Sequence, residues 1–90
     1  MPEAEADLRD ARAWYEDIRP DLGERFARVV DATIEAIART PLQFPVVHRR
    51  TRRAGIRRFP YRIFFEVQEH RIVIMACFHS KRNPKGWQSR

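Results

Sequence analysis

The sequence predicts an α+β domain in which an N-terminal antiparallel helical hairpin packs on a C-terminal antiparallel sheet of three to four strands. Up to Thr40 the apolar residues recur every three or four positions, which is the period of a helix. After Pro45 they alternate or run together over short segments, which is typical of strands. The order of helix, helix and strands favours helices packed on one face of the sheet. With 90 residues and one change of period, we expect a single domain over residues 1–90.

The helical half contains two apolar stripes. Pro2 suits the first turn of a helix, and Arg19-Pro20-Asp21 interrupts the pattern after the first stripe. Thr40-Pro41 ends the second helix, because proline disfavours helical geometry in the residue before it. So short a link between helices predicts an antiparallel hairpin. The first stripe comprises Ala4, Leu8, Ala11, Tyr15 and Ile18, and the second comprises Leu22, Phe26, Val29, Val30, Thr33, Ile34 and Ile37.

The strand half contains a short, a medium and a long apolar segment. We expect a loop at residues 49–55 and a polar hairpin turn at Gln68–Arg71. Pro60 cannot donate to a ladder, so it marks an edge or a bulge. The last segment is an almost continuous apolar run, as in a strand that is covered on both faces or lies in the centre of a sheet. The expected strands are Val46–His48, Ile56–Phe59 with Tyr61–Gln68 as one interrupted strand or two, and Ile72–His79.

Charge is divided unevenly along the chain. Residues 1–45 hold 10 acidic and 6 basic side chains, whereas residues 46–90 hold 2 acidic and 12 basic ones. The cationic half attracts polyanions or acidic protein surfaces, and a merely solvated arginine-rich surface is the alternative. Guanidinium groups bind phosphate oxygens in pairs, and an aromatic ring can stack on a base. The candidate target-binding or nucleic-acid-binding residues are Arg49, Arg50, Arg52, Arg53, Arg58, Lys81, Arg82 and Trp87, with Arg57, Arg62 and Lys85 as further cations that could converge with them.

Two of the aromatic residues have alternative interpretations. Trp87 either meets a base or an apolar socket of a partner, or packs back on the sheet as a C-terminal clasp. Trp14 is adjacent to Tyr15, which belongs to the buried stripe, so Trp14 lies at the margin of the stripe, where it could anchor a partner. We expect Ile63, Phe65 and Val67 on one face of their strand and Arg62, Phe64 and Glu66 on the other. Simple solvation is the alternative interpretation of Arg62.

Most familiar reaction chemistry is missing from the sequence. No glycine-rich phosphate loop is present, and His48, His70 and His79 lack companions at ligand spacing, so no metal and no cofactor are expected. His79 is either a structural histidine at a strand end or a general base that the surrounding arginines keep neutral. Cys77 is expected to be a small buried hydrophobe. The acidic N-terminus is unlike a secretory signal, so we expect no export. No apolar run is long enough to span a bilayer, so we expect no membrane partner.

Several stretches resemble the RelE/ParE toxins of type II toxin-antitoxin systems, and the ParE branch in particular. The resemblance covers essentially the whole chain. Its most specific parts are the strand Arg57-Arg58-Phe59-Pro60-Tyr61-Arg62-Ile63-Phe64-Phe65 and the ending His79-Ser80-Lys81-Arg82-Asn83-Pro84-Lys85-Gly86-Trp87. Glu3 to Leu8 and Thr40-Pro41 followed by Phe44-Pro45 add to it. Family members usually begin with a β-strand before the first helix, so here either the start is truncated or that strand is missing and leaves a sheet edge open.

The resemblance implies a bacterial toxin that acts in the cytoplasm, inhibits growth and contributes to plasmid stabilisation. A cognate antitoxin, ParD-like or similar, would neutralise it. Trp14, Tyr15 and Ile18 are the expected antitoxin anchors. A ParE-like member would inhibit DNA gyrase by protein contact and have no catalysis of its own. A RelE-like member would cleave mRNA in the ribosome without metal, and a degenerate, non-toxic member would only bind antitoxin. The nuclease alternative would use Arg57, or Arg58 beside it, with His79 and Arg82; since arginine is a poor general base, we prefer the gyrase interpretation.

Overall fold

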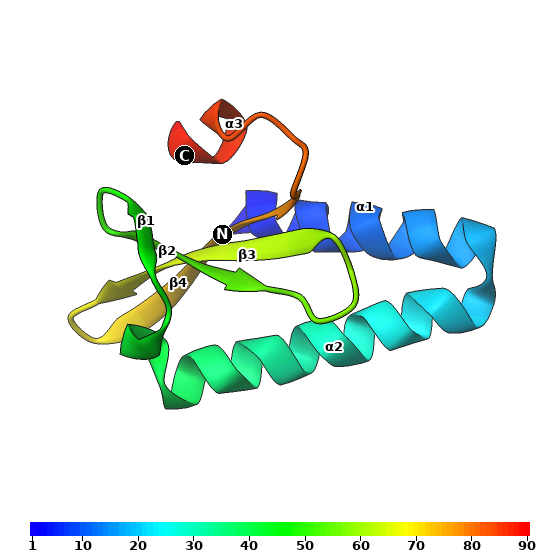
Figure 1. Cartoon of the computed structure of the whole chain (residues 1–90), viewed down its shortest axis with the longest axis horizontal. Helices are drawn as coiled ribbons and strands as arrows, with labels where there is room; N and C mark the ends of the chain where they lie inside the picture. Colours follow the sequence, from blue (N-terminus) through cyan, green and yellow to red (C-terminus); the bar gives the residue numbers. More distant parts are fainter.

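The computed structural model describes residues 1–90, and it begins with the helical hairpin that the periodicity predicts. Helix α1 covers Pro2–Ile18 and helix α2 covers Pro20–Arg39, so only Arg19 separates them. Arg19 is extended (φ −161°, ψ 134°), and the chain reverses at this residue. Each helix has proline in its first turn, where the missing N–H costs no hydrogen bond. The two helices run antiparallel, and their connected end projects beyond the sheet (Figure 1).

A single antiparallel sheet follows the helices, which confirms the predicted α+β fold. A 3-10 turn, η1 (Pro41–Gln43), leads from α2 into the sheet, whose strand order is β1-β2-β3-β4. The last strand is followed by a short helix that the sequence did not predict. The strands are β1 (Val46–His48), β2 (Thr51–Gly55), β3 (Tyr61–Gln68) and β4 (Arg71–His79), and the short helix is α3 (Lys85–Gln88).

Strand β2 corrects the predicted loop at residues 49–55. Only Arg49 and Arg50 form a turn there, while Thr51–Gly55 pair with β3. The arginines of β2 hide the apolar alternation that is typical of a strand. They are tolerated there because a long side chain can lie on a sheet face and still reach a polar partner. Arg52 illustrates this: its guanidinium group donates to the carbonyl oxygen of Phe44 at 2.7 Å.

The segment Ile56–Phe59 was predicted to be a strand and forms a turn. It is not a strand but, with Pro60, the turn between β2 and β3. The Ile56 N–H donates to the Tyr61 carbonyl oxygen, and the Phe59 N–H donates to the Ile56 carbonyl oxygen. Ile56 and Phe59 are apolar because they cover one end of the core.

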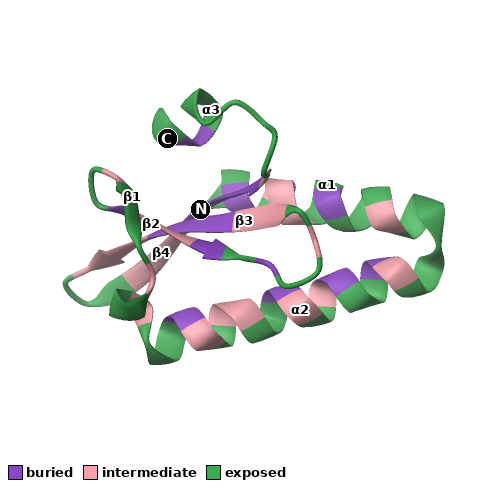
Figure 2. Ribbon diagram, viewed as in Figure 1, coloured by how far each residue is buried: buried purple, intermediate pink, exposed green.

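The main core lies between the helices and one face of the sheet. Figure 2 shows the buried positions of α2 on its side toward the sheet. Phe26 of α2 and Phe65 of β3 are almost inaccessible to solvent, at 1% and 0% exposure. The predicted stripes are confirmed except at Ile18, which is 60% exposed because the end of α1 extends past the sheet. The buried cluster is Ala11, Phe26, Val30, Ile37, Ala54, Ile56, Ile63, Phe65 and Cys77.

A second cluster covers the other face of the sheet and includes the residues after β4. Phe64 points away from the helices, as its alternation with Ile63 predicts, and Trp87 of α3 packs on it. The pairing of β3 with β4 shifts between Phe64 and Phe65, which leaves Met75 as a bulge residue. The bulge puts Ala76 and Met75 together in this second cluster, which is Phe64, Met75, Ala76, Phe78 and Trp87.

Strand β4 is therefore covered on both faces, but it is an edge strand and not a central one. The open sheet edge that the sequence predicts is the outer edge of β4. Coverage on both faces explains the almost continuous apolar run from Ile72 to Phe78, whereas position in the sheet does not.

Candidate functional site

A hollow of about 280 Å³ opens on the sheet face that the helices do not cover. Phe64 and Phe78 form its apolar floor, and cationic side chains surround it. No carboxylate is among its lining residues, so its field is uniformly positive. We call it the basic pocket; its lining residues are Val47, Arg53, Arg62, Phe64, Phe78, His79, Ser80, Arg82, Pro84 and Trp87.

The register of the sheet brings two of the arginines to this face. Arg53 of β2 lies opposite Phe64 of β3, and Arg62 of β3 lies opposite Phe78 of β4. Residues opposite each other in an antiparallel pair project to the same face, so both arginines lie on the face with Phe64 and Phe78. The third arginine, Arg82, follows β4 and places its guanidinium carbon 3.8 Å from the centre of the Phe78 ring. None of the three arginines makes an ion pair, so each is free to bind an anionic group.

His79 lies at the end of β4 in a defined tautomeric state. The Lys81 backbone N–H donates to its Nδ1 atom at 3.1 Å. A neutral imidazole has one acceptor nitrogen, so Nε2 carries the proton and is a donor. The Tyr61 ring meets the imidazole edge-on at 5.2 Å. His79 thus makes a contact that a structural strand-end histidine would make, and its role as a general base stays a prediction.

Trp87 is part of a clasp on the sheet. Its ring stacks on Phe64 with 4.0 Å between centroids and 16° between planes, and only 7% of the residue is exposed. His48 meets the same ring edge-on at 5.8 Å. In the structure Trp87 therefore packs back on the sheet, as in the second of the two alternatives that the sequence leaves open. Its contact with a target stays a prediction and would involve only the exposed rim of the ring.

The remaining predicted cations do not gather in the basic pocket. Arg50 donates to the Val67 carbonyl oxygen at 3.3 Å, and Arg52 donates to Phe44, so both side chains have structural partners. Arg49 and Arg58 occupy tight turns with positive φ values of 53° and 70°. Three further cations, Arg57 in the β2–β3 turn and Lys81 and Lys85 after β4, are exposed and outside the pocket lining.

Two polar residues of the basic pocket are not among the main candidate binding residues. Arg62 is one of the further cations, with solvation as the alternative, and its alternation with Ile63 indicates that it lies on the face opposite the main core. Ser80 carried no signal in the sequence. Its backbone N–H donates to the Pro60 carbonyl oxygen at 2.8 Å, which ties the end of β4 to the β2–β3 turn.

A second hollow, of about 520 Å³, lies on the helical side of the molecule. Tyr15, one of the expected antitoxin anchors, lines it. Ile18 is 60% exposed and lies outside this hollow. Trp14 is 64% exposed and lines a separate hollow of about 240 Å³ with Tyr61, His79 and Arg82. Large exposed apolar side chains beside cations are typical of a protein-binding surface. The lining residues are Tyr15, Leu22, Arg25, Arg28, Val29, Arg58, Phe59 and Pro60.

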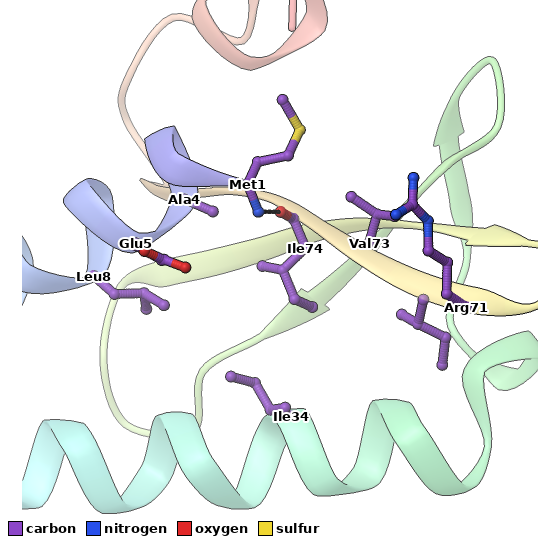
Figure 3. Close-up of a pocket in the computed structure, with 9 residues that line it drawn as sticks. Met1, Ala4, Glu5, Leu8, Ile34, Arg71, Val73 and Ile74 are labelled. Carbon is purple, nitrogen blue, oxygen red and sulfur yellow. Dashed lines mark hydrogen bonds between the residues drawn. The ribbon is translucent and has the colours of Figure 1, made fainter.

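A third hollow, of about 530 Å³, lies at the outer edge of β4. Figure 3 shows Leu8, Ile34 and Ile74 pointing into it from α1, α2 and β4, with Glu5 and Arg71 at the rim. The Met1 ammonium group donates to the Ile74 carbonyl oxygen at 3.2 Å. This contact occupies one of the edge carbonyls that an additional strand would use.

The buried ionisable groups near these hollows resist ionisation. Burial, with a smaller contribution from Asp7, raises the pKa of Cys77 from 9.0 to about 12, so the thiol stays protonated and is not a nucleophile near neutral pH. Burial likewise raises the pKa of Tyr61. No group of three histidine, cysteine, aspartate or glutamate side chains is arranged to hold a metal ion. No helix has the length and apolar content needed to cross a bilayer.

Comparison with known proteins identifies the family. A search among curated proteins finds no relative of this chain. The family model described as the ParE toxin of the type II toxin-antitoxin system, parDE, matches residues 1–84 of the 90. The match includes the helical hairpin, the whole sheet and the arginines of the basic pocket. The chain therefore belongs to the ParE toxin family of type II toxin-antitoxin systems.

Proposed function

We propose that this toxin inhibits DNA gyrase by protein contact, without catalysis of its own, and that the basic pocket is its target-binding surface. The observation that carries the proposal is that the pocket gathers Arg53, Arg62 and Arg82 without a free proton acceptor. Arginine stays protonated at any working pH, and the Nδ1 lone pair of His79 is occupied by the Lys81 N–H. Such a pocket suits acidic groups on a protein but lacks the base that phosphodiester transfer needs.

We further propose that an acidic, amphipathic segment of a ParD-like antitoxin binds the helical side. Trp14, Tyr15 and Ile18 would serve as apolar anchors there, and the arginines of the second hollow would meet the acidic groups. Neutralised in this way, the toxin would act in the bacterial cytoplasm and contribute to plasmid stabilisation by inhibiting the growth of cells that lose the antitoxin.

A second function, ribosome-dependent cleavage of mRNA, has one observation in its favour. His79 and the three arginines line the same pocket, and three guanidinium groups around one phosphate would stabilise the charge of a phosphorane. For this chemistry the imidazole must first release the Lys81 N–H, so that one of its nitrogens can accept a proton. Arg57, which the nuclease alternative also names, lies outside the pocket lining.

The functions are distinguished by induced expression in a bacterial host, with thymidine and methionine incorporation followed by pulse labelling. Gyrase inhibition predicts that thymidine incorporation falls first. An earlier fall in methionine incorporation would contradict it and favour the ribonuclease. If neither falls while the folded protein accumulates, the chain is a non-toxic member that only binds antitoxin.

Variants of the pocket sharpen the result. Arg82→Ala is expected to abolish inhibition under either function, whereas His79→Gln abolishes it only if His79 transfers a proton. Arg39→Ala, on the exposed end of α2, is the matched control for loss of one positive charge. Purified protein should also block supercoiling by gyrase in vitro and leave mRNA bound to ribosomes intact.

A further inference from the structure

The last residue of the sequence returns to the second turn of α1. The Arg90 guanidinium group donates to both carboxylate oxygens of Asp7, at 2.6 Å and 3.3 Å. The two side chains are only 16% and 10% exposed, unlike every other ion pair of the molecule. Paired donors of this kind are stronger than single ones and fix the orientation of both groups.

The same pair also occupies the outer edge of β4. The Cys77 backbone N–H donates to the Asp7 carboxylate at 3.0 Å, and Arg90 donates to the Met75 carbonyl oxygen at 3.2 Å. These two backbone groups face outward from the sheet, where a neighbouring strand would otherwise bond them. The ion pair therefore joins three parts of the chain: α1, the edge of β4 and the segment after α3.

Between β4 and Arg90, the chain is pressed against the floor of the basic pocket. A Cβ atom on Gly86 would lie 2.7 Å from Cε2 of Phe78, so α3 rests on that ring without space for a side chain. The guanidinium carbons of Arg82 and Arg90 lie 3.8 Å and 5.0 Å from the centre of the same ring. Arg82 and Trp87, which line the pocket, are thus held at one end by β4 and at the other by Arg90.

We propose that Asp7 and Arg90 form a latch that positions residues 80–90, and with them Arg82 and Trp87, for target binding at the basic pocket. The inference rests on the proposed role of that pocket. Asp7 and Arg90 are positioning residues, because they act through Arg82 and Trp87 and do not line the pocket themselves. The family match covers residues 1–84, so Asp7 lies within it, whereas α3 and Arg90 lie beyond it.

Fluorescence of Trp87 tests the latch without any partner. The chain has two tryptophans, so Trp14→Phe leaves Trp87 as the only one. In that background, Arg90→Gln and Asp7→Asn should shift the Trp87 emission to the red and increase its quenching by acrylamide. Losing charge-assisted hydrogen bonds should make the open state of the segment about tenfold to a hundredfold more populated.

Two further variants separate the latch from general effects on folding. Gly86→Ala leaves Asp7 and Arg90 unchanged but pushes α3 from Phe78, so it should expose Trp87 in the same way. Arg12→Gln breaks an exposed ion pair with Glu16 on the same helix and should change nothing. Far-UV circular dichroism confirms that each variant keeps its helices and sheet. Unchanged Trp87 quenching in Arg90→Gln would overturn the proposal.

The growth assay then links the latch to function. Arg90→Gln and Gly86→Ala should lose growth inhibition together with the protection of Trp87, while Arg12→Gln keeps both. Loss of inhibition in Arg90→Gln with Trp87 still protected would mean that Arg90 touches the target directly, and would overturn the positioning role. If the parent chain does not inhibit growth, the proposed function fails, yet the fluorescence still decides whether the latch exists.

Discussion

At the scale of the residue, neighbouring side chains in one strand serve different purposes. Arg52 and Arg53 are adjacent in β2 and point to opposite faces of the sheet. Arg52 shares the helix-facing side with Phe65 and donates to the Phe44 carbonyl oxygen, whereas Arg53 joins Phe64 on the basic pocket. The number of arginines in a segment does not distinguish a structural arginine from one in the pocket. Their alternation along the strand does so once the register of the strand is known.

This contrast predicts opposite outcomes for two similar variants. Arg52→Ala should lower the free energy of unfolding by about 1–3 kcal/mol, because it removes the donor that holds the η1–β1 connection to β2. Arg53→Ala should leave unfolding almost unchanged and weaken growth inhibition. Urea denaturation and growth after induction measure the two effects. A stable, non-toxic Arg52→Ala protein would reverse the assignment.

Cys77 predicts a loss of stability at alkaline pH. Its thiol ionises at about pH 12 in the folded protein but near its ordinary value of 9.0 in the unfolded chain. Above pH 9 the unfolded chain therefore binds fewer protons, and the free energy of unfolding falls by about 1.4 kcal/mol per pH unit up to pH 12. Below pH 9 this contribution is fully present.

Urea denaturation between pH 8 and pH 11 measures this loss. The control is Cys77→Ala, which should show a shallower fall over the same range. Tyr15 and Tyr61, whose pKa values are also raised by burial, are present in both proteins. Parallel curves for the two proteins would contradict the assignment to Cys77.

At the scale of the element, stability depends on how α2 meets the sheet. Phe26 lies at the centre of that contact, with Tyr15, Phe59 and Tyr61 around it at centroid distances of 5.2 Å, 5.2 Å and 5.5 Å. One aromatic ring thus connects both helices to the β2–β3 turn and the start of β3. Edge-to-face contacts of this kind add to the free energy gained by burial.

Truncating the Phe26 ring should lower the free energy of unfolding far more than truncating an exposed side chain. Phe26→Ala is expected to lower the free energy of unfolding by about 3–5 kcal/mol, the range found for large core aromatics. Leu42→Ala, at a residue that is 69% exposed, should cost almost nothing and is the control. Chemical denaturation gives both values, and equal effects would contradict the described core.

At the scale of the whole molecule, two hollows that each contain three arginines lie on opposite sides of the sheet. The basic pocket lies on the face away from the helices, and the hollow around Tyr15 lies on the helical side. The cationic excess of residues 46–90 supplies the pocket with arginines that no carboxylate neutralises. We therefore expect the antitoxin to bind mainly the helical side and to approach the basic pocket only at Trp14, which lines a hollow with His79 and Arg82.

Charge placement, and not net charge, should decide target inhibition. Replacing Arg53, Arg62 and Arg82 by glutamine should abolish inhibition of gyrase supercoiling, while replacing Arg25, Arg28 and Arg39 should leave most of it. Both triple variants lose the same charge, and neither set makes buried ion pairs. Equal inhibition by the two variants would show that a diffuse cationic surface is sufficient.

The fold class, the helical hairpin and the face of each central β3 residue follow from the sequence alone, because helical and strand periods are local properties of the chain. The sequence also indicated the open edge, the buried Cys77 and the exposed Trp14. The prediction was wrong at residues 49–59. Arginines interrupt the strand pattern of β2, and Ile56 and Phe59 lie in a turn although their apolar character suggests a strand.

Only the tertiary structure decided which cations meet. Arg53, Arg62 and Arg82 come from β2, β3 and the segment after β4, so their convergence depends on the register of the three strands. Likewise, Asp7 and Arg90 are separated by 83 positions, and no local pattern predicts their pairing. Periodicity reports which face a residue occupies, whereas the site depends on which faces the folded chain brings together.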